Sequence, residues 1–214
     1  MTIIDISPPL SAITPVWPGD TPFSSERTWI LDGDCPVNVS KITMTTHFGA
    51  HADAPLHFSD DGAPIDEAPL ESYIGLCTVI DARGVRNLLT ADELARLIGK
   101  RSLQPRVLFR FFDQAPQSAW PQEFPAIGAD AVHWLADRGA ILVGVDTPSL
   151  DPQHSKLMDA HHAVGARNLR ILEGLVLDHV HEGDYELIAP PLKLAGLDAA
   201  PVRAVLRTLR ETSA

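Results

Sequence analysis

The sequence predicts a mixed α/β fold, and three observations support this. First, short apolar runs typical of strands recur at residues 75–81, 107–112, 141–145, 174–177 and 186–189. Second, two amphipathic helical patterns lie between these runs. Third, six prolines within the first 36 residues disfavour long helices there. We therefore expect helices to alternate with strands in the middle of the chain, and the N-terminal third to wrap a core as loops and strands.

The two helices have recognisable ends. Residues 90–93 read Thr-Ala-Asp-Glu, which is a capping box, and Gly99 follows the last apolar residue of the pattern. This predicts a helix over 91–98. The second helix is predicted at 129–138, where apolar residues recur at helical spacing before Gly139.

Two further segments are less regular. Residues 37–48 are dense in β-branched side chains, which predicts a strand leading into a histidine-rich window. Residues 201–210 fit both an amphipathic helix and a half-buried strand, and the pattern leaves both open.

Composition limits the classes of protein. A length of 214 residues with 45% apolar and 21% charged residues predicts one globular domain over 1–214. The net charge of −11 disfavours binding to nucleic acid, and no apolar run approaches the roughly 20 residues of a membrane span. Two cysteines are too few for a disulfide scaffold. We expect a soluble cytoplasmic protein.

Six of the nine histidines fall in two clusters. The first cluster shares a window with Asp53 and comprises His47, His51 and His57. The second precedes Glu173 and comprises His154, His161 and His162. Imidazole and carboxylate together suit zinc and neighbouring transition metals. We interpret the remaining histidines as background: His133, His179 and His181.

The first cluster requires a bend in the backbone. A helix would point Asp53 away from His47 and His51, whereas an extended chain would separate the two histidines by about 13 Å. One ion with ligands at ~2 Å cannot span that distance. Gly49 stands where the chain must turn, and glycine reaches the backbone angles of a sharp turn.

The same segment resembles a known family. His47, Gly49, His51, Asp53, Pro55 and His57 resemble the HxGxHxDxPxH signature of the cyclase-like metal-dependent hydrolases, in particular of their bacterial kynurenine formamidase (arylformamidase) branch. The family pattern usually has Thr where Ala50 stands, and Ala is familiar in the formamidase branch. The likeness runs from residues 17–20 to 201–204. It implies a swivelling β/β/α domain with a mixed, barrel-like sheet and flanking helices, and a homodimer.

The resemblance also implies two divalent metal ions per subunit, expected to be zinc. One would be held by His47, His51, Asp53 and Glu173, and the other by Asp53, His161 and Glu173, so that the two carboxylates bridge the ions. The residues alone do not decide between His161 and its neighbour His162. The family's spacing to Glu173 favours His161.

Other residues are candidates for catalysis and binding. The resemblance makes His57 the proton donor and acceptor, which its ordinary pKa of ~6.5 suits, while a further ligand role is the alternative. The resemblance also makes Trp17 a residue that contacts a flat aromatic substrate; the alternative is that Trp17 packs in the core. In the loop after 141–145, Ser149 is a candidate to orient substrate. Arg110 would meet either a substrate carboxylate or a buried acid.

The implied activity is hydrolysis of N-formyl-L-kynurenine to L-kynurenine and formate in tryptophan degradation, by a metal-activated hydroxide with a histidine acid/base. An alternative within the family is the opening of a cyclic amide such as isatin. A less favoured alternative is a non-catalytic metal-binding module. We expect a small-molecule substrate and no nucleic-acid or membrane partner.

Overall fold

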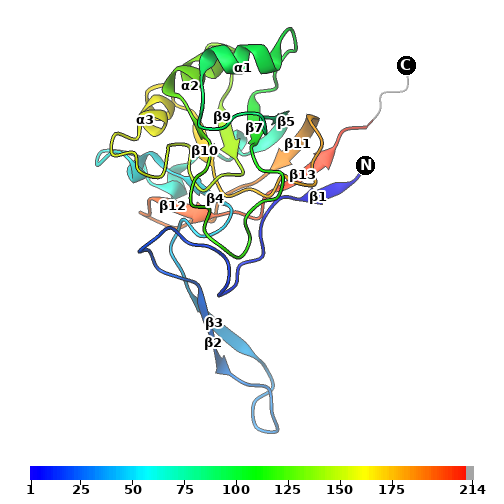
Figure 1. The fold of residues 1–214 in the computed structure, drawn as a ribbon. Coiled ribbons are helices and arrows are strands. Elements are labelled where there is room, and N and C mark those ends of the chain that lie inside the picture. The colour runs from blue at the N-terminus through cyan, green and yellow to red at the C-terminus, as the bar shows by residue number, and fades with distance from the viewer. Residues whose placement is uncertain (211–214) are drawn as a thin grey trace.

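A computed structural model describes residues 1–210 and shows a mixed α/β fold, as the sequence predicts (Figure 1). The main sheet has seven strands and curls into a half-barrel. Its strands, in spatial order, are β1 (Ile3–Asp5), β13 (Val205–Thr208), β11 (Gly183–Ile188), β5 (Ile74–Asp81), β7 (Arg106–Arg110), β9 (Leu142–Val145) and β10 (Arg170–Leu172). Among residues 1–210, no helix is long and apolar enough to cross a membrane.

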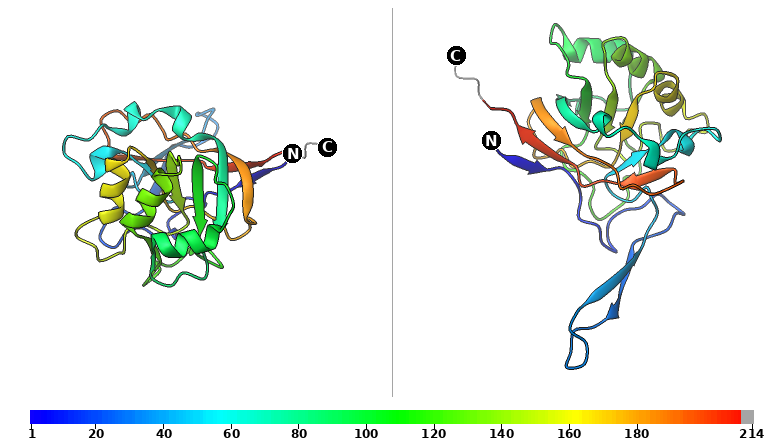
Figure 2. Two further views of the ribbon diagram at one scale, coloured as in Figure 1. Left: turned by 90° about the horizontal axis from the view of Figure 1, so that it is seen from above. Right: turned by 180° about the vertical axis from the view of Figure 1, so that it is seen from behind.

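The sheet has a parallel half and an antiparallel half. Strands β5, β7, β9 and β10 run parallel, and each is joined to the next by a helix because parallel neighbours need a crossover connection. The helices lie together beside this half of the sheet (Figure 1): α1 (Ala91–Ile98), α2 (Ala129–Ala136) and α3 (Asp159–Ala166). Strands β1, β13 and β11 form the antiparallel half, which brings the N-terminal strand beside β13 (Figure 2).

Both predicted helices are present. Helix α1 has the predicted bounds, and its capping box is formed: Glu93 N donates to Thr90 Oγ1 at 3.3 Å, and Thr90 N donates to Glu93 Oε2 at 3.1 Å. Helix α2 ends two residues earlier than the predicted 138, and the chain leaves it through Gly139, whose φ is +86°.

Four of the five predicted apolar strands correspond to β5, β7, β9 and β11, whereas the strand predicted at 174–177 is wrong. The strand of that region is β10, which ends at Leu172. Gly174 turns the chain with a φ of +66°, and a Cβ there would lie 2.3 Å from Gly49 O. The segment 201–210, which fits both a helix and a strand by its pattern, contains strand β13 (Val205–Thr208) and no helix.

Three smaller pairs of strands complete the β-structure: β2 (Ser24–Trp29) with β3 (Val39–Thr43), β4 (His51–Asp53) with β12 (Ala199–Pro201), and β6 (Leu88–Leu89) with β8 (Ala126–Ile127). The strand predicted at 37–48 is shorter than expected because the chain leaves the ladder after Thr43. The β2–β3 hairpin projects from the body of the molecule (Figure 1), and all residues of both strands are exposed. Single 3₁₀ turns follow β4 at Pro55–His57, Ile65–Glu67 and Leu70–Ser72.

The two faces of the main sheet bury separate hydrophobic clusters. One cluster lies between the parallel strands and the helices and includes Phe109, Val143 and Leu94. The other lies on the opposite face and includes Leu108, Leu172, Ala52 of β4 and Ala200 of β12. Strand β4 is thereby held against the end of β10, where the two histidine-rich windows meet.

Candidate metal centre and active site

Strand β4 and Glu173 form the base of the site. His51 N donates to Glu173 O at 3.1 Å, and Glu173 N donates to His51 O at 3.0 Å. This backbone bridge joins the first histidine window to Glu173, although His51 and Glu173 are 122 positions apart in the sequence. The bend expected before His51 is present at Gly49, whose φ is +66°.

The structure brings together all five predicted metal ligands. His47 Nδ1 lies 3.0 Å from Asp53 Oδ1, and His51 Nε2 lies 3.5 Å from both Asp53 Oδ1 and Glu173 Oε2. His161 Nε2 lies 3.4 Å from Asp53 Oδ2 and 3.4 Å from Glu173 Oε1. Each carboxylate therefore faces His51 with one oxygen and His161 with the other, which is the arrangement of a bridging ligand.

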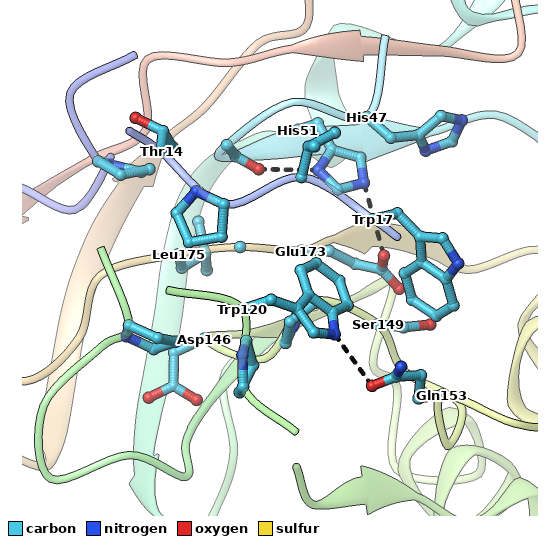
Figure 3. A pocket seen from close by; sticks show the side chains of 18 of the residues that line it. Thr14, Trp17, His47, His51, Trp120, Asp146, Ser149, Gln153, Glu173 and Leu175 are labelled. Carbon is cyan, nitrogen blue, oxygen red and sulfur yellow. Dashed lines mark hydrogen bonds and ion pairs between the residues drawn. The ribbon is translucent and has the colours of Figure 1, made fainter. Parts of the chain in front are cut away.

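These residues fit a metal ion. His51 Nε2 and Asp53 Oδ1 are buried and have no hydrogen-bond partner among the described residues. Ligands at about 2.0–2.1 Å from a tetrahedral zinc ion lie roughly 3.3 Å from one another, close to the separations found here. One ligand atom each from His51, Asp53 and Glu173 falls within 4.8 Å of the others. Figure 3 shows the His51 ring directed at the Glu173 carboxylate.

Acceptors outside the cluster orient its histidines. His51 Nδ1 donates to Gly49 O at 2.9 Å, which leaves Nε2 free to bind a cation. His161 Nδ1 lies 2.6 Å from Asp151 Oδ2, and His47 Nε2 lies 2.9 Å from Asp198 Oδ2. Neither role is predictable from the sequence, because no local pattern connects Asp151 or Asp198 to its histidine.

The structure distinguishes His161 from His162. The His161 side chain is 1% exposed and faces the cluster, whereas His162 is exposed. The backbone N–H groups of Ala160 and His161 donate to Asp151 at 3.0 and 3.1 Å, so this carboxylate fixes the start of α3 as well as the His161 ring.

His57 stands beside the cluster, at the end of the Pro55–His57 turn. Its ring centroid is 4.2 Å from that of His47, and its Nδ1 is 3.6 Å from Asp198 Oδ2. His57 has a more accessible side chain than His51 or His161. His47, Asp53 and His57 also approach closely enough to form a ligand group, so the geometry accommodates both roles considered for His57.

Electrostatics favour a cation in the cluster. Burial alone would raise the pKa of Asp53, but the close contacts of His161 and His47 with its carboxylate hold this pKa well below its usual range. Burial alone would lower the pKa of His47, but the hydrogen bonds and charges of Asp53 and Asp198 outweigh it and raise this pKa to about 9. Burial also lowers the pKa of His57. The pKa of Glu173 is lowered as well, so the ionised carboxylates of Asp53 and Glu173 attract positive charge, either protons on the histidines or a metal ion.

A cavity of about 350 Å³ opens onto the cluster and has aromatic walls. Trp17 and Trp120 meet edge to face with ring centroids 5.2 Å apart, and Trp120 Nε1 donates to Gln153 Oε1 at 3.0 Å (Figure 3). Trp17 lines the cavity and is 37% exposed, which favours contact with a substrate over packing in the core. Trp120 is not among the residues predicted from the sequence, where its only signal is a tryptophan within a proline-containing loop.

Asp146 and Ser149 also line the cavity. Asp146 accepts hydrogen bonds from the N–H groups of Phe111 and Phe112, and burial raises its pKa to about 7. Ser149 Oγ accepts from Asp151 N at 3.3 Å. Arg110 does not line the cavity, and within residues 1–210 it forms no ion pair with a buried acid; its guanidinium donates to backbone carbonyls, including that of Val180.

Imidazoles and carboxylates clustered at one end of an aromatic cavity define the site of a metal-dependent hydrolase. The chain belongs to the family described as putative cyclase, whose model matches residues 4–152. It resembles a potential metal-dependent hydrolase with cyclase activity at 32% identity and a TM-score of 0.81, over 96% of each chain.

Two further solved structures are similar. A predicted metal-dependent hydrolase from Bacillus stearothermophilus is 31% identical, with a TM-score of 0.80 over 96% of this chain and 97% of that one. Isatin hydrolase A from Labrenzia aggregata, bound to benzyl benzoate, has a TM-score of 0.85 over 98% of this chain and 94% of that one. Its identity of 24% supports a shared fold.

Proposed function

We propose that the protein hydrolyses N-formyl-L-kynurenine to L-kynurenine and formate. The main support is the juxtaposition of His57 with the ligand cluster at an aromatic cavity, since this combines a proton-transfer group with a metal centre. The signature from His47 to His57, with Ala50 as in the formamidase branch, favours this substrate within the family.

The proposal assigns the metal ligands as the resemblance implies. His47, His51, Asp53 and Glu173 would hold one divalent ion, and Asp53, His161 and Glu173 a second, with zinc suited to this donor set. Bound there, such ions polarise a carbonyl group and lower the pKa of a water molecule toward ~7.

In this proposal His57 moves the proton that the reaction requires. An arylamine leaves poorly as an anion, so its nitrogen must gain a proton as the bond to the formyl carbon breaks. His57 accepts a proton from the attacking water and returns it to this nitrogen. The Asp198 carboxylate lies 3.6 Å from Nδ1 of this ring and would stabilise its protonated form between the two transfers.

The tryptophans hold the substrate ring. The edge-to-face pair of Trp17 and Trp120 presents a rigid apolar wall to a flat aromatic group. Because Trp120 is anchored through its indole N–H to Gln153, the wall is set before the substrate arrives.

Ring opening of a cyclic amide of the isatin type is the second candidate. The aromatic wall of Trp17 and Trp120 also suits a flat cyclic amide, and isatin hydrolase A of Labrenzia aggregata shares the fold. Turnover of N-formyl-L-kynurenine and of isatin by the same metal-loaded preparation separates the two. The proposal expects a higher kcat/KM for N-formyl-L-kynurenine, and a higher value for isatin contradicts it.

A further inference from the structure

A tight turn holds Asp20 beside Trp17 at the cavity. Asp20 N donates to Trp17 O at 2.9 Å, which closes a four-residue turn. Pro18 and Gly19 occupy its central positions, and Gly19 has a φ of +93° that other residues rarely adopt. The aromatic wall and the Asp20 carboxylate are therefore displayed together by one rigid segment.

The charged groups of the cavity are unevenly distributed. Its described lining contains Asp20, Asp146 and Glu173 but no Lys or Arg. Asp146 is committed to the backbone N–H groups of Phe111 and Phe112, and Glu173 belongs to the ligand cluster.

Asp20 is the carboxylate that remains available to a ligand. It is exposed, and its Oδ1 accepts only from its neighbour Thr21, at 2.6 Å. The ion pairs that Lys and Arg form within residues 1–210 all involve other acids.

We propose that Asp20 binds the ammonium group of the substrate while Trp17 contacts its aromatic ring. The site thereby selects N-formyl arylamines whose side chain carries an amine, and it discriminates against those that carry a carboxylate alone. This inference rests on the proposed function and specifies the substrate class of the same site. N-formyl-L-kynurenine has both charges, so its ammonium group would face Asp20 and its carboxylate would face solvent.

The test compares wild type with Asp20→Asn on four substrates: N-formyl-L-kynurenine, its methyl ester, N-formylanthranilate and formanilide. The first two carry an ammonium group, the third carries only a carboxylate, and the fourth is uncharged. We expect D20N to lower kcat/KM about tenfold for the two amine-bearing substrates, mainly through KM, since a charge-assisted contact is lost. For the other two substrates kcat/KM should stay within about twofold.

Asp34→Asn is the matched control, because it removes one negative charge from the exposed loop of the β2–β3 hairpin. It should leave all four values unchanged. Equal loss on all four substrates in D20N, or no loss on any, overturns the inference while leaving the proposed function intact. The proposed function itself fails if metal-loaded wild type turns over no N-formyl arylamine.

Discussion

Asp151 Oδ2 lies 2.6 Å from His161 Nδ1, and this contact directs the opposite nitrogen of the ring toward Asp53 and Glu173. The same carboxylate accepts two backbone N–H groups at the start of α3, so its own position is fixed. Asp151 therefore links the first turn of a helix to the orientation of a proposed metal ligand.

The first prediction concerns Asp151→Asn. This variant keeps the size of the side chain but loses the charge that orients His161, so the affinity for Zn²⁺ should fall about 10–100-fold. Competition with a chromophoric chelator measures the change. The control is Asp178→Asn, which affects the comparable but more accessible pair of Asp178 with His179 and should leave the affinity unchanged. Equal affinities for D151N and wild type would refute the orienting role.

The second prediction separates the two roles considered for His57. If His57 transfers protons, His57→Ala should retain its full metal content and lose about 10²–10⁴-fold in kcat. Elemental analysis and steady-state kinetics on one preparation give both values. Loss of metal would instead identify His57 as a ligand, and unchanged turnover would exclude it from the reaction.

The third prediction concerns the aromatic wall. Trp17→Ala should raise KM about tenfold, whereas Trp17→Phe should remain within a few-fold of wild type because it keeps a flat ring. Trp17 is 37% exposed, so the midpoint of thermal unfolding should move little in either variant. A large fall in that midpoint with an unchanged KM would show that Trp17 acts in packing.

The fourth prediction concerns the pH dependence of stability. Burial raises the pKa of Asp146 to about 7, so the folded protein binds the proton more tightly than the unfolded chain does. The stabilisation is complete below the ordinary pKa of the carboxyl group and is lost as pH rises through 7. Between pH 5 and 8 it should fall by about 2–3 kcal/mol.

Asp146→Asn isolates this contribution, because all other titrating groups are common to both proteins. Denaturant unfolding across the same pH range should show a smaller fall in stability with rising pH for D146N than for wild type. Parallel pH profiles would mean that Asp146 titrates normally.

Much of the fold was predictable because its signals are local. The capping box at 90–93 and Gly99 define α1 within the chain itself, and the apolar runs of β5, β7 and β9 are bounded by turn residues. The strand predicted at 174–177 fails for a non-local reason. Gly174 must approach the Gly49 backbone across the sheet end, and nothing near Gly174 in the sequence indicates that contact.

Some features of the site were also predictable from local sequence, and others depend on distant parts of the chain. The spacing of the first histidine window requires a bend, and the structure places that bend at Gly49. The partners Asp198 and Trp120 were missed because their contacts depend on loops far away in the chain. The residues alone could not distinguish His161 from His162, because the distinction depends on how α3 packs. The packing buries the His161 ring and exposes His162.

The most direct test of the account is the hydrolysis of N-formyl-L-kynurenine before metal removal, after it, and after the return of Zn²⁺, with bound metal determined at each stage. The account predicts activity in the loaded protein, its loss with the metal, and its recovery in proportion to the metal restored. Full activity in metal-free protein, or no activity in fully loaded protein, would contradict it.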